Sequence, residues 1–270
     1  MTLYITSLAS GSSGNALIVR YNGAALLVDC GLPQRTIERA LARAELRPAD
    51  LSAILITHEH GDHVLSAGPF ARRHGVPLIA NRPTLAAIAG QLAGVTTHEL
   101  AVGAEMTLGP FQVHSFAVPH DAVAPVGYTI RAGRWCAGIA TDLGTWDETI
   151  LAALTPADLV VIEANHDHDQ LWRAPYTDEL KRRIIGPTGH LDNISAGRLL
   201  ARLGVDGKRR SAWLAHLSQE ANGPATAEKV VRGVLALAGG TWIDVTALPR
   251  RAPLFWSSDH HMQQMSLFDE

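Results

Sequence analysis

The stretch ILITHEHGDH, from Ile54 to His63, places residues of metal-binding types directly after a short apolar run. The run from Ile54 to Ile56 is apolar and β-branched, which predicts a buried strand. His58 and His60 lie two positions apart, so on an extended backbone their side chains point the same way and can bind one cation. This stretch therefore predicts a metal site at the end of a strand.

The last residues of this stretch favour a second cation. Gly61 lets the chain turn, so that Asp62 and His63 can face an ion beside the first. Imidazole and carboxylate ligands are typical of Zn, Mn or Fe sites, rather than of sites for Ca or Mg alone. The alternative is a polar loop with histidines at random positions, but it does not account for four ligand-type residues within six positions.

The composition is that of a folded protein without a membrane segment. Of 270 residues, 47% are hydrophobic and 18% are charged, so the chain can bury a thick core in one large or two small domains. The net charge of −3 argues against general nucleic-acid binding but leaves room for a local basic face. Cys30 and Cys136 form no CxxC motif, the amino terminus lacks a signal-peptide pattern, and no run of about 18 apolar residues occurs. We therefore expect a reducing, cytoplasmic location and no membrane partner.

Hydrophobic patterns along the chain indicate an α/β (α+β) fold. Strands are predicted at residues 3–8, 16–21, 24–29, 76–80, 159–163 and 212–216, with several short strands between residues 95 and 140. Helices are predicted at residues 34–44, 83–93, 176–183, 194–203 and 225–237, and after the metal-binding stretch up to His74. Blocks of strands separated by helices favour two sheets packed face to face with helices outside, a four-layer αββα sandwich. We expect a catalytic domain at residues 1–255 and a flexible tail at residues 256–270.

The loop from Ser10 to Asn15 (SGSSGN) and the residue Asp29 each leave two interpretations open. A loop rich in Ser and Gly can bind a phosphate through backbone N–H groups, but a plain hairpin turn explains it equally, because no GxxxxGK[ST] motif follows. Asp29 ends the apolar run LLVD. Its carboxylate can hydrogen-bond a metal-binding histidine, or it can cap the helix expected near Pro33.

Three further residues of ligand types follow apolar runs: His120 after FAVP, Asp142 after GIAT and His216 after AWLA. Strand ends on one edge of a sandwich converge through their loops, which is where binding sites are built. With the first stretch, these residues predict two cations about 3.5–4 Å apart that hold a hydroxide for attack on a phosphate. The predicted ligands are His58, His60 and His120 for one cation and Asp62, His63 and His216 for the other, with Asp142 as the bridge.

The sequence resembles the metallo-β-lactamase-fold hydrolases in the order of Asp29, the HxHxDH cluster, His120, Asp142 and His216. More narrowly, it is similar to the YycJ (WalJ) group in the segments LASGSSGN, ATDLG, EANHD, GHLDN and HLSQEAN. The resemblance covers residues 1–250. It implies an αββα fold, two transition-metal ions (Mn, Fe or Zn), and phosphodiester hydrolysis with 5′→3′ exonuclease activity on DNA.

Roles follow for residues around the cations. Asp62 is expected to act as a base as well as a ligand. His190 resembles the histidine that donates a proton to the leaving oxygen, a task suited to its near-neutral pKa; the alternative is a structural hydrogen bond beside a helix start. Asp192 and Ala221 stand where this group usually has Ser and Asn, which bears on substrate contacts and not on the metals. Weaker candidates for substrate contact are Ser12, Asn15, Asn165, His166, Asn193 and Asn222. For His166 the alternative is a structural role inside the protein.

The tail contains a short apolar motif. The segment SSDHHMQQMSLFDE after Trp256 is mostly polar and has too little apolar surface to fold alone. Its Leu and Phe would fill an apolar pocket on a partner while Gln hydrogen-bonds the rim; the alternative is a tail that packs on its own domain. The motif resembles the peptide Gln-Leu-[Ser/Asp]-Leu-Phe with which bacterial replication and repair proteins bind the sliding clamp, and it consists of Gln264, Met265, Ser266, Leu267 and Phe268.

We therefore expect a dinuclear-metal phosphodiester hydrolase, and in particular a DNA exonuclease of repair. The carboxylate of Asp142 favours phosphodiesterases and thioesterases over class B1 lactamases, which carry Cys at that place. The alternative function is a small-molecule hydrolase of the same fold, a glyoxalase-type thioesterase or cyclic phosphodiesterase, with an enclosed pocket and no activity on DNA. A third hypothesis, a clamp-bound adaptor with a vestigial site, is disfavoured by the seven intact ligands.

Overall fold

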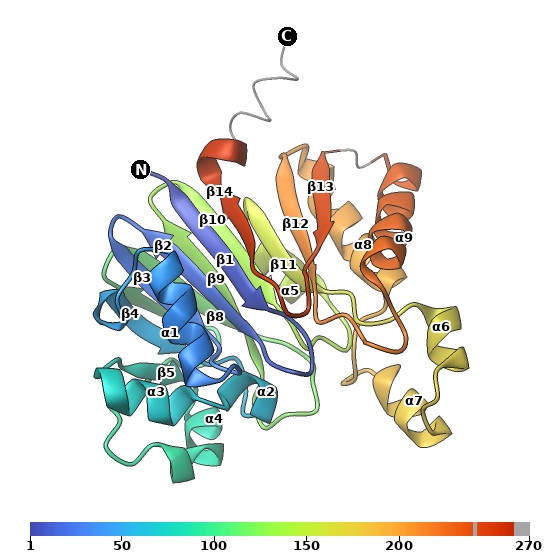
Figure 1. The fold of residues 1–270 in the computed structure, drawn as a ribbon. Coiled ribbons are helices and arrows are strands. Elements are labelled where there is room, and N and C mark those ends of the chain that lie inside the picture. The colour runs from blue at the N-terminus through green and yellow to red at the C-terminus, as the bar shows by residue number, and fades with distance from the viewer. Residues whose placement is uncertain (240–241, 262–270) are drawn as a thin grey trace.

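Two mixed seven-stranded sheets form the centre of the protein in the computed structural model, which describes residues 1–239 and 242–261 (Figure 1). The first sheet has the order β14 (Leu254–Ser257), β1 (Leu3–Ala9), β2 (Ala16–Tyr21), β3 (Ala24–Val28), β4 (Leu51–Leu55), β5 (Leu78–Ala80) and β6 (Thr97–Glu99). The second has the order β13 (Ile243–Ala247), β12 (Arg210–Ala215), β11 (Leu159–Glu163), β10 (Trp135–Ala140), β9 (Val126–Ala132), β8 (Phe111–Ala117) and β7 (Glu105–Leu108).

Helices cover the outer faces of both sheets (Figure 1). The helices against the first sheet are α1 (Gln34–Arg43), α2 (Gly61–Val64), α3 (Ala67–His74) and α4 (Arg82–Ala87). Those against the second sheet are α5 (Glu148–Leu154), α8 (Asn193–Leu203) and α9 (Pro224–Leu237). Two short helices, α6 (His168–Arg173) and α7 (Asp178–Ile184), lie apart from these layers (Figure 1). None of the helices within the described ranges is long and apolar enough to cross a membrane.

Three apolar cores hold the four layers together. The central core joins the sheets, with Ile5 of the first sheet and Phe111 of the second both fully buried in it. A second core packs the first sheet against α1 and α3, and a third packs the other sheet against α5, α8 and α9. The predicted αββα sandwich is confirmed, because each sheet buries one face on its partner and the other on helices.

The element boundaries correct three predictions. The helix predicted at residues 83–93 ends at Ala87 and is followed by a short 3₁₀ helix at Ala89–Gln91, where Gly90 weakens helix propensity. Strands β13 and β14 were not predicted, since β14 is only four residues long and owes its place to pairing with β1. The predicted boundary between domain and tail after residue 255 falls inside β14. Packing continues beyond this strand, because Ser258 and His261 are buried.

Parallel strands carry the polar strand ends to one region. In the first sheet β3 and β4 run parallel, so Asp29 and the loop with His58 leave the same edge. In the second sheet β10, β11 and β12 run parallel, so Asp142, Glu163 and His216 also share an edge. Residues far apart in sequence therefore meet at one rim of the sandwich.

A buried arginine supports the second sheet and gives a test of stability. Arg210 at the start of β12 is 1% exposed, and its guanidinium donates to the carboxylate of Asp206 at 2.7 Å and to the carbonyl of Leu203 at 2.9 Å. We expect Asp206→Asn to lower the free energy of unfolding by about 1–3 kcal/mol, because the buried cation loses its charged partner.

This contribution should depend on pH. The hydrogen bond from Arg210 lowers the pKa of Asp206 to about 2, below the unfolded value of about 3.9. The stabilisation is therefore complete above roughly pH 4 and is lost as the pH falls towards 2. Urea unfolding of both proteins at pH 7 and pH 3 measures the difference. A difference of equal size at both values would contradict this explanation.

Candidate metal centre

The first ligand group comes from the loop after β4 and the loop after β8. His58 and His60 lie in the loop, and His120 reaches them from the second sheet, with one ring nitrogen of each within 4.8 Å of the others. The ring of His120 is oriented by a hydrogen bond between Nδ1 and the carbonyl of Gly189, at 3.1 Å. Its Nε2 is therefore the nitrogen that remains for a cation.

The second ligand group joins α2 to the end of β12. Asp62 and His63 lie on the four-residue helix α2, and His216 follows β12 directly. The Oδ2 atom of Asp62 lies 3.6 Å from Nε2 of His63 and 3.5 Å from Nε2 of His216. These three atoms surround one point, as the sequence predicts for the second cation.

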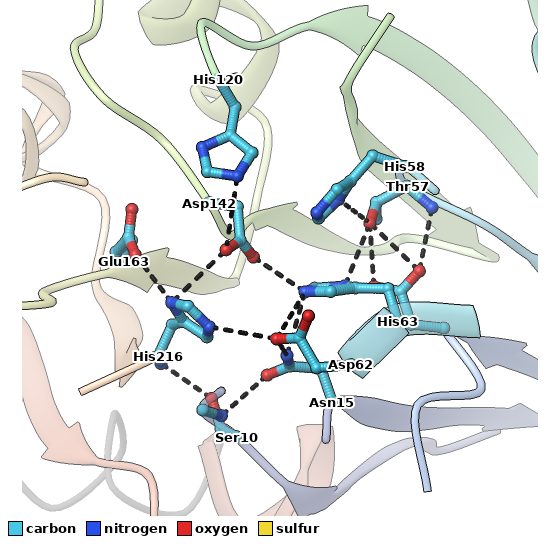
Figure 2. Close-up of polar contacts among 12 residues, drawn as sticks. Ser10, Asn15, Thr57, His58, Asp62, His63, His120, Asp142, Glu163 and His216 are labelled. Atoms are coloured by element: carbon cyan, nitrogen blue, oxygen red, sulfur yellow. Dashed lines mark hydrogen bonds and ion pairs between the residues drawn. The ribbon is translucent and has the colours of Figure 1, made fainter. Parts of the chain in front are cut away.

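The side chain of Asp142 lies between the two groups (Figure 2). Its Oδ2 is 3.1 Å from Nε2 of His63 in the second group, and its Oδ1 is 3.9 Å from Nε2 of His120 in the first. One carboxylate oxygen thus faces each group. This is the geometry that a bridging ligand requires.

Asp29 orients His63 and does not cap α1. Its Oδ2 lies 2.7 Å from Nδ1 of His63, and its Oδ1 accepts from the backbone N–H of Thr57 at 2.9 Å. Helix α1 begins after Pro33 without a side-chain cap. Of the two interpretations of Asp29, the structure therefore favours the hydrogen bond to a histidine of the metal centre.

Glu163 was missed by the sequence analysis. This fully buried residue ends β11, and its Oε1 lies 2.8 Å from Nδ1 of His190 and 2.9 Å from Nδ1 of His216. Its Oε2 accepts from the backbone N–H groups of Leu143 and Leu191. Both oxygens are engaged in hydrogen bonds, so Glu163 orients the two histidines and is not a free cation ligand. Its position at the end of the apolar run LVVIE is the same signal that marked Asp142 and His216.

Three residues of this region hold strained backbone conformations. Asp29, Asp142 and His216 have φ angles of 59°, 54° and 53°, in the left-handed region that is costly for residues other than glycine. Two hydrogen bonds fix the backbone conformation of His216: its N–H donates to Oγ of Ser10, and its carbonyl accepts from Nδ2 of Asn165. Such strain persists where surrounding contacts determine the conformation, and it is common at functional sites.

The residues present fit divalent cations. Nε2 of His58, Nε2 of His216 and Oδ2 of Asp142 are buried and have no hydrogen-bond partner among the described residues. Buried polar atoms without partners are costly, and a cation would satisfy all three. The separations also suit a shared ion, because ligands about 2.1 Å from a tetrahedral zinc lie roughly 3.4 Å apart. The fold and these clusters indicate divalent metal ions.

Protons and cations compete for the second group. Burial opposes the protonated form of His216, but the surrounding carboxylates, with Asp142 first, raise its pKa to about 10. Burial is likewise outweighed at His63, where Asp29 and Asp142 raise the pKa. A cation at Nε2 of either ring replaces a proton, since metal ligands are deprotonated.

Two histidines of the first group, His58 and His120, favour the neutral form. Burial lowers the pKa of His58 well below its ordinary value, and burial also lowers the pKa of His120. Both rings therefore offer an unprotonated nitrogen at pH 7 without losing a proton first.

Most of the weaker substrate candidates are engaged inside the protein, which corrects their assignment. Asn193 and Asn222 are buried and hydrogen-bond each other, with 2.9 Å between Nδ2 of Asn222 and Oδ1 of Asn193. Asn165 is also buried, and its Nδ2 donates to the carbonyl of His216. His166 is buried too, but its Nδ1 has no hydrogen-bond partner among the described residues, so its contact with substrate stays a prediction. These amides stabilise the loops under the site, because buried polar groups must be hydrogen-bonded.

The remaining residues named from the sequence differ in their surroundings. Ser12 is exposed, so its contact with substrate stays a prediction. Asn15 is buried against the second ligand group. Asp192 caps α8 by accepting from two backbone N–H groups, a role that Ser would also fill. The clamp motif at Gln264–Phe268 lies outside the described residues.

Comparisons with known proteins define the class. A sequence profile of the β-lactamase superfamily domain matches residues 25–217. The metallo-β-lactamase fold protein YhfI from Bacillus subtilis superposes with a TM-score of 0.73 at 18% identity, covering 96% of this chain and 100% of that structure. Fold and site together define a metal-dependent hydrolase of the metallo-β-lactamase fold.

Two proteins with similar sequences identify the family within this class of hydrolases. Exodeoxyribonuclease YycJ from Bacillus anthracis is 35% identical over 238 residues, which cover 87% of this chain and 90% of the relative. Exodeoxyribonuclease WalJ from Streptococcus pneumoniae is 37% identical over 220 residues, which cover 80% of this chain and 81% of the relative. The chain belongs to the family of these two proteins within the β-lactamase superfamily, which confirms the resemblance inferred from the motifs.

Proposed function

We propose that the protein is a two-cation DNA exonuclease that acts in the 5′→3′ direction in DNA repair, with Mn, Fe or Zn as the cations. The proposal is carried by one combination of features. Two ligand groups share Asp142, and a histidine held by Glu163 lies beside them. The relatives named as exodeoxyribonucleases support DNA as the substrate.

The proton transfers are assigned to two residues. Bound divalent cations activate water and neutralise phosphate charge in such a displacement. Burial opposes ionisation of Asp62, but His216 and His63 lower its pKa, so its carboxylate can accept a proton from the attacking water. Burial also opposes the charged form of His190, but Glu163 raises its pKa, which favours the protonated ring that can donate a proton. As water oxygen bonds to phosphorus and the P–O3′ bond breaks, Nε2 of His190 donates its proton to the leaving oxygen.

A cationic side chain at the rim supports a polyanionic substrate. The Nε atom of Arg183 on α7 donates to Oδ2 of Asp121 at 2.6 Å, and Oδ1 of Asp121 lies 3.3 Å from Nε2 of His120. The Arg183 side chain remains 65% exposed. A guanidinium held beside the first ligand group suits contact with a DNA phosphate.

We expect the purified protein with Mn²⁺ to degrade end-labelled DNA from the 5′ end, and Asp62→Ala to lose about 10²–10⁴-fold in rate through loss of its proton acceptor. Chelation of the cations should abolish the activity. Time courses with label at either end, on duplex and single-stranded DNA, measure polarity and strand preference. Equal degradation by both proteins would show that a contaminant is responsible.

The same preparation tests the alternative function. A small-molecule hydrolase would cleave a thioester or a cyclic nucleotide and leave DNA intact. Cleavage of such a substrate, with loss of that activity in Asp62→Ala and no action on DNA, would replace the nuclease proposal by this alternative.

We also propose that the tail binds the bacterial sliding clamp through Gln264–Phe268. The support is the sequence pattern, whose Leu and Phe would fill an apolar pocket on the clamp while Gln hydrogen-bonds its rim. Deletion of residues 264–270 should abolish capture of the protein by immobilised clamp, while metal content and nuclease rate on naked DNA stay unchanged. Undiminished capture of the deletion variant would refute this part of the proposal.

A cytoplasmic location is proposed on the state of the cysteines. Cys30 and Cys136 are both free and buried. Free thiols without disulfides are typical of proteins in a reducing compartment.

A further inference from the structure

We propose that Asn15 is a positioning residue for the second cation, because its amide holds the carboxylate of Asp62, a predicted ligand of that cation. This inference rests on the two-cation centre of the proposed function. It assigns to the loop between β1 and β2 a role in cation affinity instead of substrate contact.

The contacts of the Asn15 amide are specific. Nδ2 donates to Oδ2 of Asp62 at 3.1 Å, and this oxygen keeps a further lone pair for a cation (Figure 2). Nδ2 also lies 2.9 Å from Nε2 of His63, but the single lone pair of that nitrogen serves either this contact or a cation, so the bond to Asp62 carries the proposal. Asn15 is 5% exposed, so water does not compete freely for these contacts. A donor at Oδ2 restrains rotation of the Asp62 carboxylate and keeps this oxygen directed at His63 and His216.

The orientation of the amide is determined by the loop itself. Oδ1 of Asn15 accepts from the backbone N–H of Gly11 at 2.8 Å, so the NH₂ group must face the ligands. Asn15 cannot be a substrate contact in this arrangement, because both ends of its amide are engaged.

The backbone of Asn15 is tied to the same helix. Its N–H donates to the carbonyl of Asp62 at 2.8 Å, and its carbonyl accepts from Gly31 at 3.0 Å. A Cβ atom at Gly31 would lie 1.6 Å from the carbonyl oxygen of Asp62, so this close approach requires glycine. Backbone and side chain of Asn15 therefore act together on α2.

The loop also reaches the third ligand of the group. Oγ of Ser10 accepts from the backbone N–H of His216, whose conformation is strained. One loop thus holds the side chain of Asp62 through Asn15 and the backbone of His216 through Ser10. The structure explains the polar sequence SGSSGN by these contacts without a bound phosphate.

The test is a titration of the metal-free protein with Zn²⁺ in competition with a chromophoric chelator, which yields the two dissociation constants. Asn15→Ala should weaken one constant by about 10–100-fold, as loss of a hydrogen bond to a ligand does elsewhere, and leave the other unchanged. Nuclease activity should fall at limiting Mn²⁺ and recover at excess Mn²⁺, with the KM for DNA unaltered. Ser13→Ala, an exposed position of the same loop, is the control and should change neither constant.

A second variant separates positioning from folding. Asn15→Asp keeps an acceptor for the N–H of Gly11 but replaces the NH₂ donor by an anionic oxygen. It should bind the affected cation more tightly, by about tenfold or more, because a carboxylate attracts a nearby dication. Opposite shifts in the two variants support the proposal; equal weakening of both constants in both variants, or no change in either, overturns it. Fewer than two Zn²⁺ ions on the wild-type protein would instead refute the proposed two-cation centre.

Discussion

Asp142→Asn is expected to remove at least one cation and to lower DNA hydrolysis by about a thousandfold or more. The two oxygens of Asp142 face different ligand groups, at 3.1 Å from Nε2 of His63 and 3.9 Å from Nε2 of His120. Asn preserves the shape but loses the charge and one acceptor. Several kcal/mol of lost charge stabilisation correspond to about three powers of ten in rate. Metal content per chain and kcat on end-labelled DNA measure the two effects.

The matched control is Asp158→Asn. Asp158 is also a buried carboxylate of the second sheet, but it accepts from the backbone N–H of Cys136 and pairs with Lys208. This variant should lose stability while keeping its metal content and rate. If Asp142→Asn retained the full metal content and the wild-type rate, Asp142 would not be the bridge.

Glu163→Gln is expected to lower kcat by about 10²–10³-fold and to weaken the binding of one cation by about 10–100-fold. Oε1 of Glu163 contacts Nδ1 of both His190 and His216, so one substitution disturbs the proposed proton donor and a proposed cation ligand together. In the native protein burial opposes ionisation of Glu163, but His190 and the hydrogen bonds of both rings lower its pKa to about 2. The carboxylate is therefore charged throughout the working pH range, and Gln removes that charge.

Rates at saturating Mn²⁺ separate the two effects of this substitution. Excess Mn²⁺ should restore occupancy of the weakened cation site, but it should not restore the part of the rate that is lost through His190. Glu228→Gln is the control. Glu228 lies in α9, away from the centre, and it likewise accepts from a backbone N–H, that of Ala247. Full recovery of Glu163→Gln at excess Mn²⁺ would show that His190 does not need Glu163 for proton transfer.

The candidate ligands could be predicted because His58, His120, Asp142 and His216 each lie just after a recognisable apolar run. The run before His58 and the runs that precede Asp142 and His216 form buried strands β4, β10 and β12. A polar residue at the end of such a strand is uncommon unless it serves a site, and the HxHxDH spacing adds the local geometry. These signals are local, so they survive in the sequence without knowledge of the fold.

Glu163 shows where the local signals end. It follows an apolar run like the other residues, but its partners His190 and His216 are 27 and 53 positions away. A carboxylate can be a ligand, a cap or a hydrogen-bond acceptor, and only the partners that converge on it decide among these roles. Its place at a strand end is a signal that could have singled it out, but that signal assigns no role.

The sequence by itself determined the αββα layers and the residue types that meet in the candidate metal centre. The tertiary structure alone decided that β14 completes the first sheet, that Asn165, Asn193 and Asn222 are internal, and that Asn15 lies against α2. The physical reason is the distance along the chain over which each kind of interaction acts. Periodicity and turn chemistry act over a few residues, whereas the contact from His216 to Ser10 spans 206 positions and exists only once both sheets have packed.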